Sequence, residues 1–321
     1  MIAYRDKNRI HVVACVGAGV IGAGWVAAFL GSGRTVRLFD PAADAGEQTR
    51  RHVTGAWDQM TELGLAAKGD EWEARLSIHG SLAEAVTGAD FVQESTPERS
   101  DLKRSLFADL DALLPPEVLV ASSTSSLPIS DLQAGLAHAG RFVLGHPFNP
   151  VHLIPLVEVG GGEASAPEAI AIARDLYASM RKEPILIERE IFGHIGNRLT
   201  SAMFREAVRL VAEGYASVGD IDRAIRYGPA LKWAIQGQFT TFHTSGGAGG
   251  LAEFLPKFAP GIVKRWSTMA DPSLEDAALQ GLLVRQMEEA AQGRSVGEIA
   301  AQQDATLLAM LKLLDQRKGD L

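Results

Sequence analysis

The sequence predicts an α/β fold, with a doubly wound sheet followed by an all-helical domain, and three observations lead to it. Short β-rich runs alternate with helical stretches as far as Glu188, which is typical of a parallel sheet covered on both faces. The glycine pattern Gly17-x-Gly19-x-x-Gly22 stands between the first β-rich run and the first helical stretch. From Ile191 onward only helical periodicity is found. We therefore expect a Rossmann-type domain over residues 1–189 and an all-α domain over residues 190–321.

The elements of the first domain follow from the spacing of its apolar residues. Strands are expected where short apolar, β-branched runs end at glycine, at Asp-Pro or at a polar turn, namely at 11–16, 35–39, 90–93, 118–122, 141–145, 154–159 and 184–188. Helices are expected where apolar residues recur with helical spacing or alanine is frequent, at 20–30, 43–63, 81–86, 101–113 and 167–180.

The second domain is expected to consist of helices alone. Helical periodicity covers residues 191–213, 218–226, 274–290 and 296–314. Between the second and third of these segments, residues 227–266 hold seven aromatic side chains, more than twice the density of an even spread. This stretch has no assigned element in the prediction.

Composition excludes several classes of protein. The chain has 321 residues, of which 31 are Lys or Arg and 39 are Asp or Glu, so its formal net charge is −8. An acidic balance disfavours nucleic acid and anionic membranes as partners. The only cysteine, Cys15, excludes an intramolecular disulfide and a cysteine-rich zinc site. We expect a cytoplasmic protein with a small-molecule partner and no metal.

The glycine pattern predicts a dinucleotide site. Gly17 permits a tight turn, Gly19 lets the backbone approach a pyrophosphate, and Gly22 lets helix and strand pack closely. The expected helix begins with Val20 and Ile21, and the amides of its first turn are expected to face the phosphates. Asp40 ends the second strand, where a carboxylate accepts hydrogen bonds from ribose hydroxyls and repels a 2′-phosphate. The predicted cofactor is NAD, and the alternative is a glycine-rich turn with no ligand.

A histidine and a glutamate are the candidates for acid–base chemistry. His146 ends one predicted strand, and Glu158 lies near the end of the next. Neighbouring parallel strands would bring the two side chains together at the carboxyl edge of the sheet. A carboxylate that holds an imidazole fixes its tautomer and favours its protonated form, which suits interconversion of an alcohol and a ketone. The spacing is equally compatible with a structural His–Glu pair.

Several motifs in one order resemble the 3-hydroxyacyl-CoA dehydrogenase superfamily. They are GAGVIG at 17–22, ADFVQESTPER at 89–99, SSTSSL at 122–127, GHPFNPVHLIPLVE at 145–158 and GNRL at 196–199. The resemblance implies that His146 is the catalytic base, that Glu158 is its partner and that Ser125 and Asn197 belong to the active site. It also implies that Glu98 and Lys103 contact the nicotinamide side of the cofactor. The alternatives are a helix cap at Ser125 and a cap or interdomain bond at Asn197.

Within the superfamily, the sequence is most similar to the branch of carnitine 3-dehydrogenases and lambda-crystallin/L-gulonate 3-dehydrogenases. The run SSTSS at 122–126 has serine where the CoA-ester enzymes usually have asparagine, and Pro147 follows His146 in place of an aromatic residue. The resemblance implies NAD-dependent oxidation of a 3-hydroxy acid, with L-carnitine to 3-dehydrocarnitine as the first reaction. L-gulonate and a 3-hydroxyacyl-CoA are the alternatives, and a crystallin-like structural protein is the alternative of another class. The helical domain is expected to form a homodimer.

The aromatic stretch bears on the substrate. A trimethylammonium group donates no hydrogen bond, so aromatic faces are its usual contacts. Aromatic residues at helical spacing equally fill a core or a dimer interface. For a substrate carboxylate, Arg198, Arg226 and Lys232 are candidates. The segment 242–245, FHTS, departs from the aromatic–arginine pair expected there, and the glycines at 246–250 form either a lid or a plain loop.

Overall fold

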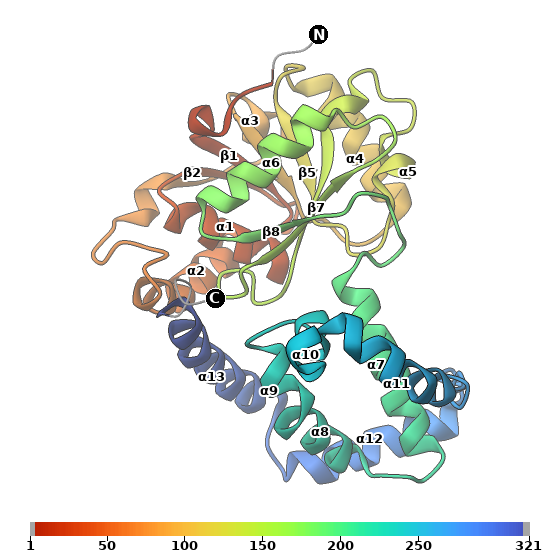
Figure 1. The fold of residues 1–321 in the computed structure, drawn as a ribbon. Helices are drawn as coiled ribbons and strands as arrows, with labels where there is room; N and C mark the ends of the chain where they lie inside the picture. Colours follow the sequence, from red (N-terminus) through yellow and green to blue (C-terminus); the bar gives the residue numbers. More distant parts are fainter. Residues whose placement is uncertain (1–3, 317–321) are drawn as a thin grey trace. The chain divides into compact units, whose positions relative to one another are not determined.

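The computed structural model describes residues 4–316 (Figure 1). Residues 1–3 and 317–321, at the outer ends of the two predicted domains, lie outside this range. The chain divides into two compact units between Asn197 and Arg198. The first is α/β and the second is helical, as the sequence predicts.

The first unit is built on a sheet of eight strands in the order β3-β2-β1-β4-β5-β6-β7-β8. Strands β1 to β6 run parallel to one another. Strand β7 is antiparallel to β6, and β8 is parallel to β7. The reversal of strand order around β1 is the point at which doubly wound sheets bind ligands. The strands are β1 (Val12–Val16), β2 (Thr35–Phe39), β3 (Leu76–Ile78), β4 (Phe91–Glu94), β5 (Leu119–Ser122), β6 (Phe142–Pro147), β7 (Leu156–Gly161) and β8 (Glu183–Leu186).

Helices cover both faces of this sheet (Figure 1). Side chains alternate along β1, so that Val13 and Cys15 join the core under α1, α2 and α6, while Ala14 and Val16 join the core under α3, α4 and α5. The helices are α1 (Val20–Gly31), α2 (Ala45–Glu62), α3 (Leu82–Val86), α4 (Ser100–Leu113), α5 (Ile129–Gln133) and α6 (Pro167–Ser179), with short 3₁₀ turns at Lys7–Arg9, Trp72–Arg75 and Ala139–Arg141.

The strands that carry His146 and Glu158 are antiparallel, so the predicted parallel arrangement is wrong at this point. Strand β6 pairs with β7 so that His146 lies directly opposite Glu158. The physical reason is the length of the connection between the two strands. Residues 148–155 are too few for the crossover that a parallel pair requires, whereas they suffice to turn the chain back.

The second unit consists of helices in its described residues. Helix α7 begins at Gly196, five residues later than the predicted start at 191. The segment 188–195 that precedes it is a loop. Residues 227–266, which had no predicted element, form three helices and a 3₁₀ turn at Gly247–Gly249. The helices are α7 (Gly196–Ala212), α8 (Val218–Tyr227), α9 (Pro229–Trp233), α10 (Gln238–Ser245), α11 (Leu251–Trp266), α12 (Ala277–Ala291) and α13 (Val296–Gln316).

Part of the aromatic stretch forms the core of the helical unit. Phe254 on α11 is 5% exposed, and its ring centroid lies 4.7 Å from that of Phe242 and 4.7 Å from that of Phe258. Helix α11 could not be predicted from the sequence, because Pro256 and Pro260 fall inside it and proline usually ends a helix. Across residues 4–316, no helix is both long enough and apolar enough to cross a membrane.

Candidate active site

The glycine loop between β1 and α1 has the geometry that its sequence predicts. Gly17 has φ +96°, and a Cβ there would lie 2.5 Å from the carbonyl oxygen of Ser95. A Cβ on Gly22 would lie 2.0 Å from the carbonyl oxygen of Gly17, so strand and helix approach as closely as glycine allows. A Cβ on Gly19 would meet nothing within 4 Å, and Val20 is 63% exposed. The first turn of α1 therefore offers free amides beside open space.

Asp40 stands at the end of β2 next to this loop. Its Oδ2 accepts a hydrogen bond from the Ala18 amide at 2.7 Å, and its Oδ1 accepts one from the Ala42 amide at 2.8 Å. These bonds orient the carboxylate beside the glycine loop and leave lone pairs for further donors. The glycine loop and Asp40 thus fit the phosphates and a ribose of a dinucleotide.

His146 and Glu158 form a buried pair. The imidazole Nδ1 lies 2.7 Å from Glu158 Oε2. Glu158 is fully buried, and His146 is 6% exposed. The pairing follows directly from the register of β6 and β7, which places the two residues opposite each other.

Glu158 is held as a carboxylate. Its second oxygen, Oε1, accepts hydrogen bonds from the amides of Ile195 and Gly196, both at 2.9 Å. Burial alone raises the pKa of this carboxyl, but the hydrogen bonds from His146 and from the two amides outweigh it, so that the pKa is lowered. Because an ionised carboxylate only accepts hydrogen bonds, His146 Nδ1 must carry a proton. In the neutral ring, Nε2 is then free to act as a base.

The serine loop after β5 is organised by Glu98. The Oε1 atom of Glu98 accepts hydrogen bonds from the Thr124 hydroxyl at 2.7 Å and from the Ser125 and Ser126 amides at 2.8 and 2.9 Å. Burial raises the pKa of Glu98, but the hydrogen bond from Thr124, the charge of Lys103 and the hydrogen bonds from Ser126 together lower it below its usual value. Pro128, not Ser125, precedes helix α5, so the cap alternative for Ser125 is wrong.

Lys103 lies in the interior behind this loop. It is 1% exposed, and its ammonium donates to Glu94 Oε1 at 2.7 Å and to the Thr96 carbonyl at 3.1 Å. Glu98 Oε2 lies 3.7 Å away. The side chain is thus placed beneath Glu98, where its charge favours the ionised form of that carboxyl.

Asn197 and His194 complete the cluster, and His194 was not among the predicted residues. The Asn197 amide donates to the Ser125 carbonyl at 3.3 Å. The centroid of the His146 ring lies 5.1 Å from that of the His194 ring and 5.2 Å from that of the Phe148 ring. The GNRL motif drew attention to Asn197 alone, because nothing in the sequence places the preceding loop beside β6.

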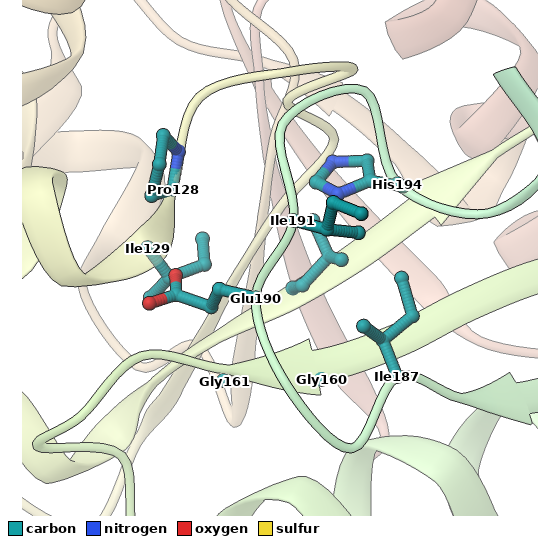
Figure 2. A pocket seen from close by; sticks show the side chains of 9 residues that line it. Pro128, Ile129, Gly160, Gly161, Ile187, Glu190, Ile191 and His194 are labelled. Carbon is teal, nitrogen blue, oxygen red and sulfur yellow. The ribbon is translucent and has the colours of Figure 1, made fainter. Parts of the chain in front are cut away.

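A small cavity borders this cluster (Figure 2). It has a volume of about 10 Å³ and is lined by Leu144, Ile187, Ile191, His194 and neighbouring residues. Glu190 points toward the start of α5 and accepts a hydrogen bond from the Ser130 amide at 3.0 Å. The cavity is too small for a substrate and holds at most a water-sized group.

Comparison with known proteins gives this arrangement a family. The profile of the 3-hydroxyacyl-CoA dehydrogenase NAD binding domain matches residues 12–191, and that of the 3-hydroxyacyl-CoA dehydrogenase C-terminal domain matches residues 193–285. The chain belongs to the 3-hydroxyacyl-CoA dehydrogenase family. As a member of this family it is an NAD-dependent oxidoreductase.

Similar family members cover nearly the whole chain. The L-carnitine dehydrogenase of Nocardiopsis dassonvillei is 48% identical over 98% of this chain and 94% of its own length. The L-carnitine dehydrogenase of Streptomyces coelicolor is 48% identical over 96% of each chain. Among solved structures, 5-formyl-3-hydroxy-2-methylpyridine 4-carboxylic acid 5-dehydrogenase is 27% identical, covers 95% of this chain and 99% of its own, and gives a TM-score of 0.80.

Proposed function

We propose that the protein oxidises L-carnitine to 3-dehydrocarnitine with NAD. The observation that carries the proposal is the 48% identity to L-carnitine dehydrogenases over at least 96% of the chain. The buried His146–Glu158 pair supports it, because removal of the hydroxyl proton of a 3-hydroxy acid requires a base of this kind.

In this proposal His146 Nε2 takes the proton from the substrate hydroxyl. Glu158 accepts the Nδ1–H bond throughout, so the imidazole keeps its orientation and its positive charge is stabilised once the proton arrives. When bound, NAD would supply the hydride acceptor for the C–H bond of the carbon atom that carries this hydroxyl group. The products are a ketone, reduced cofactor and a proton that His146 releases to solvent.

Ser125 and Asn197 orient the reacting groups. The Ser125 backbone is fixed from two sides, by Glu98 on its amide and by Asn197 on its carbonyl. Its hydroxyl lies 3.2 Å from Glu98 Oε1, a long bond that a substrate or the cofactor carboxamide can replace. We propose that both side chains hydrogen-bond the substrate oxygen or the carboxamide and thereby fix the transfer geometry. Glu98 would border the nicotinamide, and Lys103 would act through Glu98.

The helical unit supplies the candidates for binding the trimethylammonium group and for a homodimer. The core ring of Phe254 is excluded as a ligand contact because it is 5% exposed, whereas Tyr227, Phe239 and Trp266 are more than 60% exposed. Large exposed apolar side chains of this kind mark interaction surfaces. We propose that they serve a homodimer and, in part, an aromatic site for the ammonium group. Size-exclusion chromatography with light scattering tests the homodimer.

A substrate panel tests the proposed reaction. Carnitine, gulonate and 3-hydroxybutyryl-CoA are compared side by side, with reduction of NAD followed by absorbance. The expected result is turnover with carnitine and at least about 10²-fold lower kcat/KM with the other two. Activity with only gulonate or the CoA ester would exclude carnitine. The His146→Ala variant is expected to lower kcat by more than about 10²-fold, and a loss of less than tenfold would exclude His146 as the base.

A further inference from the structure

The loop that ends the first unit holds three parts of the site together. The amides of Ile195 and Gly196 donate to Glu158. The side chain of Asn197 donates to the Ser125 carbonyl at 3.3 Å. The remaining member of this segment, His194, reaches the serine loop and the His146 ring at the same time.

His194 makes two distinct contacts. Its Nε2 lies 2.9 Å from the carbonyl oxygen of Thr124, the residue before Ser125. Its ring lies against the His146 ring, with centroids 5.1 Å apart and planes at 52°. The side chain is 4% exposed, and its backbone has φ +49°, a value that few residues with a side chain adopt. The ring is therefore presented from a left-handed backbone position in the loop.

His194 is a neutral hydrogen-bond donor. A carbonyl oxygen only accepts, so Nε2 carries the proton in this contact. Burial lowers the pKa of His194, and the charge of His146 lowers it further, while the Thr124 carbonyl, Glu158 and Glu98 act in the opposite direction. The ring is uncharged at neutral pH, so it does not oppose the positive charge that His146 acquires on taking a proton.

We propose that His194 is a positioning residue of the dehydrogenase reaction, which fixes the serine loop and the His146 imidazole relative to each other. This inference rests on the proposed role of His146 as the base. An imidazole suits the task because it combines a flat apolar face toward His146 with a directed N–H toward Thr124. Thr124 itself is fully buried, so its carbonyl has no ready replacement for this donor from solvent.

Two substitutions separate the two contacts. Phenylalanine keeps a ring against His146 but removes the donor, whereas the side-chain amide of glutamine places a donor where Nε2 stands. His152→Phe is the matched control, because His152 is also buried, at 6% exposed, and also makes a hydrogen bond through Nε2, to Gln59 Oε1 at 3.0 Å. His152 contacts α2 and not the serine loop, so the control reports the general effect of replacing a buried, hydrogen-bonded histidine.

The experiment measures kcat, the KM for NAD and hydrogen exchange of the amides of residues 124–127 in each variant. His194→Phe is expected to lower kcat about 10- to 100-fold, because a misplacement of about 1 Å costs about that much. The KM for NAD should change less than about twofold, since this loss concerns the reacting geometry and not binding. Amide exchange at 124–127 should accelerate in His194→Phe and return toward the wild-type rate in His194→Gln. His194→Gln should recover part of the lost kcat, because it restores the donor to Thr124 but not the ring against His146, and His152→Phe should have the kcat of the wild type.

Any one of three kinetic outcomes, or one outcome of the exchange measurement, would overturn the inference. The kinetic outcomes are a kcat of His194→Phe within about twofold of wild type, an equal loss in His194→Gln, or an equal loss in His152→Phe. Hydrogen exchange is measured without substrate and therefore reports the serine loop itself. Unchanged exchange of the amides of residues 124–127 in His194→Phe also refutes the positioning role. His146→Ala is measured in parallel. If that variant remains active the proposed function fails, whereas a normal His194→Phe beside an inactive His146→Ala overturns only the present inference.

Discussion

The buried Lys182 makes the free energy of unfolding depend on pH, and this dependence can be measured. It precedes β8, is 7% exposed, and donates to the carbonyls of Val151 and Ile154, the second at 2.9 Å. Its ammonium also lies 6.0 Å from the Trp25 ring centroid. Because burial is not offset by a carboxylate, the pKa of Lys182 falls to about 7 from the ordinary 10.5. The perturbation is Lys182→Met, which keeps the length of the side chain and removes the titrating group.

The sign of the effect follows from proton binding. Between pH 7 and 10.5 the unfolded chain keeps the proton on Lys182 while the folded chain has lost it, so stability rises with pH in this window. Each pH unit corresponds to at most about 1.4 kcal/mol. Allowing for partial protonation near pH 7, the contribution of Lys182 to the free energy of unfolding becomes more favourable by about 2 kcal/mol between pH 7 and pH 9.

Urea denaturation of wild type and Lys182→Met at pH 7, 8 and 9 measures this contribution. The quantity of interest is the wild-type free energy of unfolding minus that of the variant, which should rise by about 2 kcal/mol over the range. Burial also raises the pKa of the Cys15 thiol and of the Tyr177 hydroxyl, which destabilises both proteins equally at high pH and cancels in the difference. A difference that stays constant within about 0.5 kcal/mol would show that Lys182 remains charged in the folded state.

Two further predictions concern the cofactor and the base. Asp40→Ala is expected to reduce the ratio of kcat/KM for NAD to that for NADP at least about tenfold, because the carboxylate that repels a 2′-phosphate is gone; an unchanged ratio contradicts the assignment of Asp40 to the ribose. Glu158→Gln keeps the shape of the side chain but removes the charge that stabilises protonated His146, so kcat should fall about 10²-fold while the melting temperature reports folding. A kcat within about threefold of wild type would show that His146 needs no ionised partner.

The local signals in the sequence were sufficient for most of the cofactor half of the fold, although they did not predict the short strand β3 or the short helix α5. Gly17, Gly22 and Asp40 act through backbone conformation and short-range contacts, which the residue types themselves dictate. The pairing of His146 with Glu158 was also anticipated, although in a parallel arrangement, because strand patterning carries no information on direction. The length of the connection was the signal that decides between the two.

Other features depend on tertiary contacts and left no local signal. The sequence around His194 gives no sign that its ring contacts His146, because that contact depends on the position of the loop beside β6. Helix α11 contains two prolines, and packing of Phe254 against Phe242 and Phe258 favours the helix in spite of them. The burial of Lys103 beneath Glu98 likewise depends on the position of Glu94 in the neighbouring strand. Propensity and periodicity describe a segment by itself, so they miss what its neighbours impose.

The direct opposition of His146 and Glu158 across β6 and β7 has a consequence for how such enzymes diversify. His146 and Glu158 are twelve residues apart and share one antiparallel hairpin, so their opposition is set by a short stretch of chain, while the amides of Ile195 and Gly196 orient Glu158 from farther along the sequence. Substitutions in the helices of the second unit leave the register of this hairpin unchanged, so sequence divergence there is compatible with an intact His146–Glu158 pair.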